Sequence, residues 1–137
     1  MILADTSAWI EYLRATGGAV HLRLLELLRT SAPLAVTDVV LMEVLAGAAD
    51  NAHHDRLRRL IARCEYLPVD GPSDYVQAAR LHRSCRRQGV TIRRIPDCLI
   101  AVVAMRCGAA VLHADHDFDA IARCAPLEIA AAIGASS

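Results

Sequence analysis

Short apolar runs alternate with longer stretches of helical periodicity along the 137-residue chain. The apolar runs predict strands at residues 2–4, 34–36, 66–69 and 109–112, with a further small strand at 127–129. The longer stretches predict helices at residues 9–13, 20–28, 39–45, 52–64, 72–89 and 97–107. Strands and helices are therefore expected to follow one another through most of the sequence.

Polar and helix-breaking residues mark the expected helix ends. The hydroxyls of Thr6 and Ser7 suit the start of the first helix, and Thr37 or Asp38 suits the start of the third. Gly108 follows the last predicted helix and favours its termination there. These signals separate each expected helix from the apolar run beside it.

The apolar runs do not alternate strictly between apolar and polar residues, as a strand with one solvent-exposed face does. Such runs are typical of a parallel sheet that helices cover on both sides. We predict the α/β class, a three-layer α/β/α sandwich around a short central parallel sheet with right-handed crossovers. The length predicts one domain over residues 1–137, with a loose Ala-Ser-Ser tail.

Composition changes this picture mainly through the distribution of charge. The chain has 15 basic and 15 acidic residues, and every basic residue is arginine. Ten arginines lie between Arg56 and Arg94, where only three residues are acidic, so the zero net charge is a cancellation. This segment either binds the phosphates of a nucleic acid or forms a solvated helix face, and both interpretations stay open.

The cysteines and the N-terminus indicate the cellular setting. The five cysteines form no CxxC pair and have no histidine at zinc-ligand spacing, which argues against disulfides and a zinc site. The first residues do not resemble a signal peptide, and the longest apolar run, from Cys98 to Met105, is too short to span a membrane. We therefore expect a cytoplasmic protein that does not contact a membrane.

Four acidic residues occupy positions where a parallel sheet usually binds its ligand. Asp5 and Asp115 come directly after or near the ends of predicted strands, and ligands bind beyond the carboxyl ends of such strands. Asp97 begins a helix that can open onto the same edge. Glu43 lies inside an apolar helix with no basic residue within one turn. Each aspartate also fits a helix cap, so no single position decides its role.

If these carboxylates converge, their repulsion requires a cation. Two carboxylates about 4 Å apart repel by roughly 4 kcal/mol at an effective dielectric of about 20, whereas a helix dipole returns only about 0.3–1 kcal/mol. A carboxylate site without thiolate or imidazole suits Mg²⁺, with Mn²⁺ as a substitute. Such a site can polarise a phosphodiester and activate water, which predicts metal-dependent phosphodiester hydrolysis.

The motifs around these acids resemble a known family. They are Asp5-Thr6-Ser7-Ala8, Met42-Glu43-Val44-Leu45-Ala46-Gly47, Pro96-Asp97-Cys98-Leu99-Ile100-Ala101 and His113-Ala114-Asp115-His116-Asp117-Phe118. In this order, and over essentially the whole chain, they resemble a PIN domain, with the closest similarity to VapC-type toxins of bacterial toxin-antitoxin pairs.

This resemblance implies a fold, an activity and a set of partners. It implies a Mg²⁺-dependent endoribonuclease that cleaves RNA, forms a homodimer and is neutralised by a cognate antitoxin. On the family pattern, Asp5 and Asp97 hold the metal most directly, and Glu43 and Asp115 complete the acidic cluster. Two auxiliary residues follow from the same pattern: Asp117 is a further acid, and the Ser7 hydroxyl lines the site.

Other interpretations of the same sequence remain. A PIN-like module without catalytic activity that binds RNA or an antitoxin is the main alternative, although the presence of all four acids argues against it. A phosphotransfer receiver domain needs a lysine, which the chain lacks. His113 and His116 fit either a proton shuttle or a strand-end position without a catalytic role.

Overall fold

The structure, a computed structural model, describes residues 1–132, so the predicted Ala-Ser-Ser tail lies outside the described residues. The strands are β1 (Ile2–Ala4), β2 (Leu34–Val36), β3 (Glu65–Tyr66) and β4 (Ala110–Leu112). The helices are α1 (Thr6–Leu13), α2 (Ala19–Arg29), α3 (Asp38–Ala46), α4 (Asn51–Ile61), α5 (Ser73–Arg87), α6 (Ile95–Cys107) and α7 (His116–Cys124). All strand pairs are parallel, in the order β3-β2-β1-β4, which confirms the predicted α/β class.

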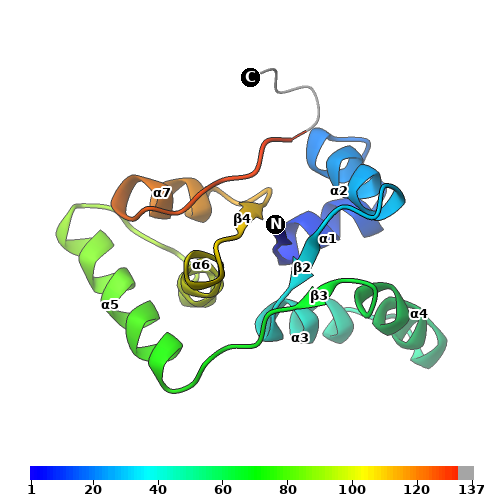
Figure 1. Cartoon of the computed structure of the whole chain (residues 1–137), viewed down its shortest axis with the longest axis horizontal. Coiled ribbons are helices and arrows are strands. Elements are labelled where there is room, and N and C mark those ends of the chain that lie inside the picture. Colours follow the sequence, from blue (N-terminus) through cyan, green and yellow to red (C-terminus); the bar gives the residue numbers. More distant parts are fainter. Residues whose placement is uncertain (133–137) are drawn as a thin grey trace.

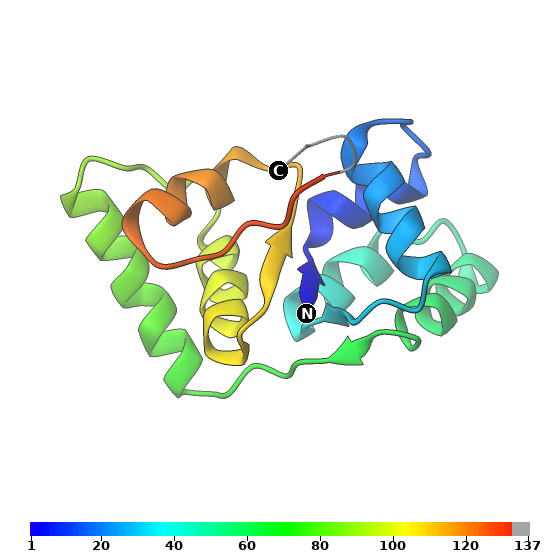
Figure 2. The same cartoon turned by 45° about the horizontal axis from the view of Figure 1, so that its top comes forward.

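The sheet forms the middle layer of three. Helices α1 to α4 lie on one face of the sheet, and α5 to α7 lie on the other (Figures 1 and 2). From β1 the chain moves outward to β2 and β3, and it then crosses back to place β4 on the free side of β1. This reversal of strand order opens a crevice beyond the carboxyl ends of β1 and β4, where parallel sheets bind ligands.

Helix α6 is the central helix of the core. Every residue from Asp97 to Ala104 is buried, so this helix is apolar around its circumference except at its N-terminal acid. Trp9 and Phe118 are the largest fully buried side chains, one from each helical layer. At the other end of α6, Gly108 takes the left-handed conformation with φ 68°, as predicted for a residue that terminates a helix.

The predicted hydroxyl cap of the first helix is wrong, whereas the third helix does begin after Thr37. Asp5 is the N-cap of α1, and its carboxylate accepts a hydrogen bond from the Ala8 N–H, whereas Thr6 lies inside the helix. Thr37 is the N-cap residue of α3, but its side chain forms no capping bond. Because the Asp5 carboxylate caps α1, the hydroxyls of the first turn are free for contacts with distant segments.

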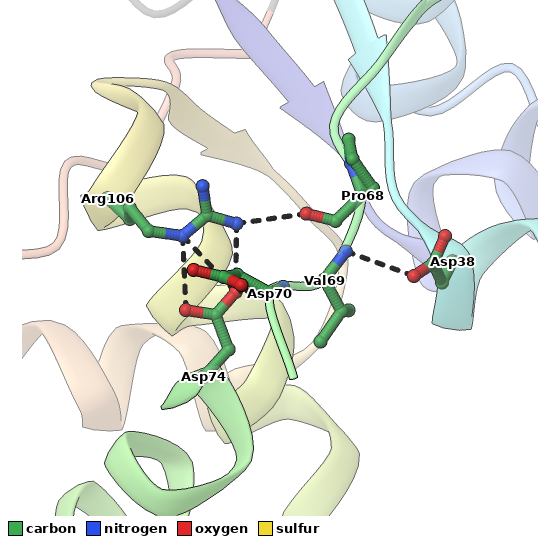
Figure 3. Close-up of polar contacts among 6 residues, drawn as sticks. All are labelled: Asp38, Pro68, Val69, Asp70, Asp74 and Arg106. Atoms are coloured by element: carbon green, nitrogen blue, oxygen red, sulfur yellow. Dashed lines mark hydrogen bonds and ion pairs between the residues drawn. The ribbon is translucent and has the colours of Figure 1, made fainter. Parts of the chain in front are cut away.

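The third predicted strand is displaced by one residue and shorter than expected. Pairing covers residues 65–66 rather than 66–69, because Pro68 lacks an N–H and the Val69 N–H donates to the Asp38 carboxylate (Figure 3). The predicted strand at 127–129 is reduced to one parallel bridge between Val111 and Ile129. Helix α7 was not predicted, although the spacing of the buried residues Phe118 and Ile121 is helical.

An ion pair between a buried carboxylate and a half-buried arginine joins the N-terminus of α5 to the C-terminus of α6. Arg106 donates from Nε and Nη2 to both carboxylate oxygens of Asp74, at 2.8–3.2 Å, and from Nη2 to the Pro68 carbonyl (Figure 3). The Asp74 side chain is 3% exposed. The Arg106 guanidinium and the Asp70 N–H hold the pKa of Asp74 below its ordinary value, against the opposing effect of burial.

The arginine-rich segment does not form one surface. Helices α4 and α5 lie at opposite ends of the molecule in both views (Figures 1 and 2). One group of arginines therefore lies on α4 and another on α5, while Arg63 donates to the Leu28 carbonyl at 3.1 Å. No helix within residues 1–132 is both long enough and apolar enough to cross a membrane.

Candidate active site

Asp5 lies at the carboxyl end of β1, and two neighbours hold its side chain. The Ser7 hydroxyl donates to Asp5 Oδ1 at 2.8 Å, and the Ala114 N–H donates to Ser7 Oγ at 2.8 Å. Ser7 therefore links Asp5 to the loop that follows β4, across the crevice. Asp5 is 2% exposed, and burial raises its pKa despite the bonds from Ser7 and Ala8.

Asp97 reaches the same edge from the first turn of α6. It is 2% exposed, and within residues 1–132 its buried Oδ2 accepts no hydrogen bond. Burial, followed by the nearby carboxylates of Asp115 and Asp5, raises the pKa of Asp97 to about 8. The protein thus places a carboxylate where solvent and hydrogen-bond donors are both scarce.

Asp115 and Asp117 flank the start of α7. Asp115 is the N-cap and accepts a bond from the Asp117 N–H at 3.0 Å. That bond, Asp97 and the Arg94 charge hold the pKa of Asp115 below its ordinary value, although burial acts in the opposite direction. Asp117 Oδ2 accepts the backbone N–H groups of Arg93 and Arg94, which fixes the segment that leads into α6.

Glu43 comes from α3 and forms the side of the site nearest α1. Its Oε1 accepts a hydrogen bond from the Thr6 hydroxyl at 2.8 Å, and its Oε2 forms an ion pair with Nη2 of Arg94. The basic partner that the α3 sequence lacks is thus supplied from a position 51 residues further along the chain. The Glu43 side chain is 21% exposed, so this pair lies at the mouth of the crevice.

His113 holds the loop between β4 and α7. Its Nδ1 accepts the Asp115 N–H at 3.1 Å, so the ring proton resides on Nε2, which donates to Asp119 Oδ1 at 3.1 Å. The ring is 6% exposed and packs against Phe118 with centroids 5.2 Å apart. This arrangement orients the backbone that carries Asp115.

The acidic groups fit a hard divalent cation. Oxygen atoms of Asp97, Asp115 and Asp117 all lie within 4.8 Å of one another. The donor set consists of carboxylates alone, which favours Mg²⁺ or Mn²⁺ over zinc. Among residues 1–132 no group bonds to Oδ2 of Asp97, and ionisation of this buried carboxyl would be costly without a cation beside it.

The six residues expected from the sequence are not equally close. Asp97, Asp115 and Asp117 form the compact group, Asp5 and Ser7 lie beside it, and Glu43 is engaged by Thr6 and Arg94. Sequence reasoning missed three contributors: Thr6, Arg94 and His113 in its contact with Asp115. The only signal in the sequence for any of the three was that Arg94 lies three residues before Asp97. Arg93 lies nearly as close to Asp97, so this signal does not single out Arg94.

Known proteins share the sequence pattern and the fold of this chain. The PIN domain family model matches residues 2–123. Ribonuclease VapC11 of Mycobacterium tuberculosis is 46% identical over 131 residues, which cover 95% of this chain and 98% of that protein.

Two solved structures share the fold at low sequence identity. One is VapBC2 from Rickettsia felis bound to a DNA fragment from its promoter, with a TM-score of 0.74, 18% identity and coverage of 96% of this chain and 99% of that chain. The other is a toxin-antitoxin complex from Klebsiella pneumoniae, with a TM-score of 0.67, 19% identity and coverage of 94% and 100%. They confirm the predicted three-layer architecture. By the family model and the close relative, this chain belongs to the PIN-domain family and, within it, to the VapC ribonucleases.

Proposed function

We propose that the chain acts as a single PIN domain and is a Mg²⁺-dependent endoribonuclease, the toxin of a toxin-antitoxin pair. The observation that carries the proposal is the group of Asp97, Asp115 and Asp117 beside Asp5, with one buried carboxylate oxygen that no donor of the described residues reaches. The 46% identity to a named ribonuclease supports RNA as the substrate.

Each acidic residue has a distinct part in this proposal. Asp97 and Asp115 hold the metal, with Asp5 and Asp117 beside them, and Glu43 closes the site toward α3. Ser7 keeps the Asp5 carboxylate oriented through bonds to both of its oxygens, at 2.8 and 3.0 Å. Because the supporting bonds come from the backbone and from short side chains, the carboxylates are held before the substrate arrives.

The proposed reaction is hydrolysis of an RNA phosphodiester. A bond forms between the water oxygen and phosphorus, and a bond from phosphorus to a ribose oxygen breaks. The water proton passes to a carboxylate oxygen, and the departing ribose oxygen takes a proton from solvent. The bound cation supplies Lewis acidity to the phosphate and to the attacking water.

The test is cleavage of total RNA by the purified protein, followed by sequencing of the new ends. We expect cleavage with Mg²⁺ or Mn²⁺ and none with EDTA. Asp97→Asn and Asp5→Asn should abolish cleavage, while Asp55→Asn on the exposed side of α4 serves as the charge-matched control. Equal cleavage by Asp97→Asn and the wild type would contradict the assignment. RNA binding without cleavage would instead support the inactive module.

An antitoxin is the protein partner we propose. The support is the fold shared with a toxin-antitoxin complex and a largely apolar groove between α1, α3 and α4, which Arg14, Glu43 and His53 also line. Ile10 and Leu13 line this groove and are 39% and 38% exposed, which suits the apolar face of a helix. Leu13→Glu should weaken co-purification with the antitoxin and leave RNA cleavage by the free toxin intact.

We also propose a homodimer that uses a different face. Met42, Tyr75 and Ile95 are each more than half exposed and line one groove between α3, α5 and α6. Large apolar side chains grouped in this way favour burial against a second copy. Sedimentation of the wild type and of Tyr75→Glu tests this assembly, and a wild-type monomer at micromolar concentration would contradict it.

A further inference from the structure

Arg94 has a fixed backbone at the entrance to the acidic cluster. It is the residue before α6, its N–H donates to Asp117 Oδ2 at 3.0 Å, and its carbonyl accepts the Asp97 N–H at 3.0 Å. The two acids that hold its backbone belong to the proposed metal site. The guanidinium therefore extends from an anchored position beside the carboxylates.

The guanidinium itself is only partly used. Nη2 pairs with Glu43, but within residues 1–132 neither Nε nor Nη1 donates to a protein atom, and the side chain is 47% exposed. The hydrogen bond to Glu43, then the charges of Glu43, Asp97 and Asp115, raise the pKa of Arg94. Arg94 is thus a permanent cation that faces the cluster with unused donors.

An exposed ion pair of this kind contributes little stability and exchanges readily. A phosphodiester is a better partner for Arg94, because a guanidinium fork matches two phosphate oxygens and the transition state carries additional negative charge. A divalent cation in the cluster would offset the carboxylates and leave the guanidinium available to an incoming anion. The chemistry of this position therefore favours a phosphate oxygen as the second partner of Arg94.

We propose that Arg94 is a catalytic residue of the ribonuclease that donates hydrogen bonds to a non-bridging oxygen of the scissile phosphodiester and exchanges Glu43 for it during turnover. This inference rests on the proposed function. Arg94 transfers no proton in this role, and its effect is on charge that develops in the transition state.

Arg94→Ala is the test variant, and Arg93→Ala is its matched control. Arg93 carries the same charge one residue away, is exposed, and within residues 1–132 forms a hydrogen bond only through its backbone N–H. In steady-state cleavage with Mg²⁺, Arg94→Ala should have a kcat about a hundredfold lower with little change in KM, as expected for a lost transition-state donor. Arg93→Ala should stay within about threefold of wild type.

Two further measurements separate this role from a structural one. Added methylguanidine should restore part of the rate of Arg94→Ala and none for Arg93→Ala, since only the first variant leaves a guanidinium site at the phosphate. Mn²⁺ titrated into the RNA-free protein should bind Arg94→Ala at least about as tightly as wild type, because a repelling positive charge has been removed. A structural defect would weaken Mn²⁺ binding and the rate together.

The outcomes distinguish this inference from the function on which it rests. If wild type shows no Mg²⁺-dependent cleavage, the proposed function fails, and this inference fails with it. If wild type cleaves RNA and Arg94→Ala matches Arg93→Ala, only the role of Arg94 is overturned. A slow Arg94→Ala that binds Mn²⁺ poorly and does not respond to methylguanidine also overturns it, because Arg94 would then act through the fold.

Discussion

Asp97→Asn should stabilise the metal-free protein at neutral pH. In the folded chain the pKa of Asp97 is raised from 3.8 to about 8 by burial and by Asp115 and Asp5. Between these two pH values the unfolded carboxyl is ionised while the folded one keeps its proton. The folded state thus binds more protons, so the free energy of unfolding falls as pH rises through this window.

The size of this loss in the free energy of unfolding follows from how far the pH lies above 3.8. Each pH unit costs about 1.4 kcal/mol, so the loss by pH 7 approaches about 4 kcal/mol if nothing relaxes, and about 2–4 kcal/mol allows for rearrangement around the pair. Asparagine carries no charge, and its amide N–H can donate to Asp115 as the protonated Asp97 does. The variant should therefore avoid most of this loss.

Urea unfolding in EDTA at pH 5, 6, 7 and 8 provides the assay. The wild type should lose stability steadily over this series, while Asp97→Asn should stay nearly level and exceed it by about 2–4 kcal/mol at pH 7. Mg²⁺ should stabilise the wild type at pH 7 and have little effect on the variant. Parallel pH profiles for the two proteins, with Asp55→Asn as a surface control, would refute the reasoning.

Three further changes test the supporting structure. His113→Val removes the acceptor of the Asp115 N–H and should weaken Mn²⁺ binding about tenfold in calorimetry, whereas His113→Thr should preserve it because a hydroxyl can accept the same N–H. Arg106→Gln leaves the Asp74 carboxylate buried without its cation and should cost about 3 kcal/mol in urea unfolding, with RNA cleavage unchanged in the folded protein. Gly108→Ala should cost about 1 kcal/mol in the same assay, because alanine is strained at φ 68°.

The sequence predicts the sheet better than the site. Parallel strands buried on both faces appear as short apolar runs, and three of the four were placed within one residue. Helix α7 was missed because its first turn is acidic and polar, and only Phe118 and Ile121 mark the helical period. The local pattern of apolar residues thus predicts a helix or strand when the buried residues of that element mark its period.

Contacts between distant segments could not be predicted in this way. The positions of Asp5 and Asp115 follow from the strand ends, but the pairing of Glu43 with Arg94 depends on how α3 packs beside the start of α6. The bond from Ala114 to Ser7 likewise spans 107 residues. Such contacts depend on tertiary packing, and nothing in the local sequence distinguishes Arg94 from Arg93.

Each end of α6 carries an arginine–carboxylate ion pair, and the two pairs differ in how deeply the carboxylate is buried. At the C-terminal end, the Asp74 side chain is 3% exposed and the Arg106 side chain is 40% exposed. Arg106 uses Nε and Nη2 on the buried carboxylate, so separating them leaves that charge in the interior and costs up to about 3 kcal/mol, because solvent partly screens the guanidinium. At the N-terminal end, Arg94 and Glu43 are 47% and 21% exposed, and such a pair is worth about 0–1 kcal/mol. Only the second pair can open at a cost that a phosphate contact readily offsets. The fold therefore keeps one arginine for stability and leaves the other available beside the acids.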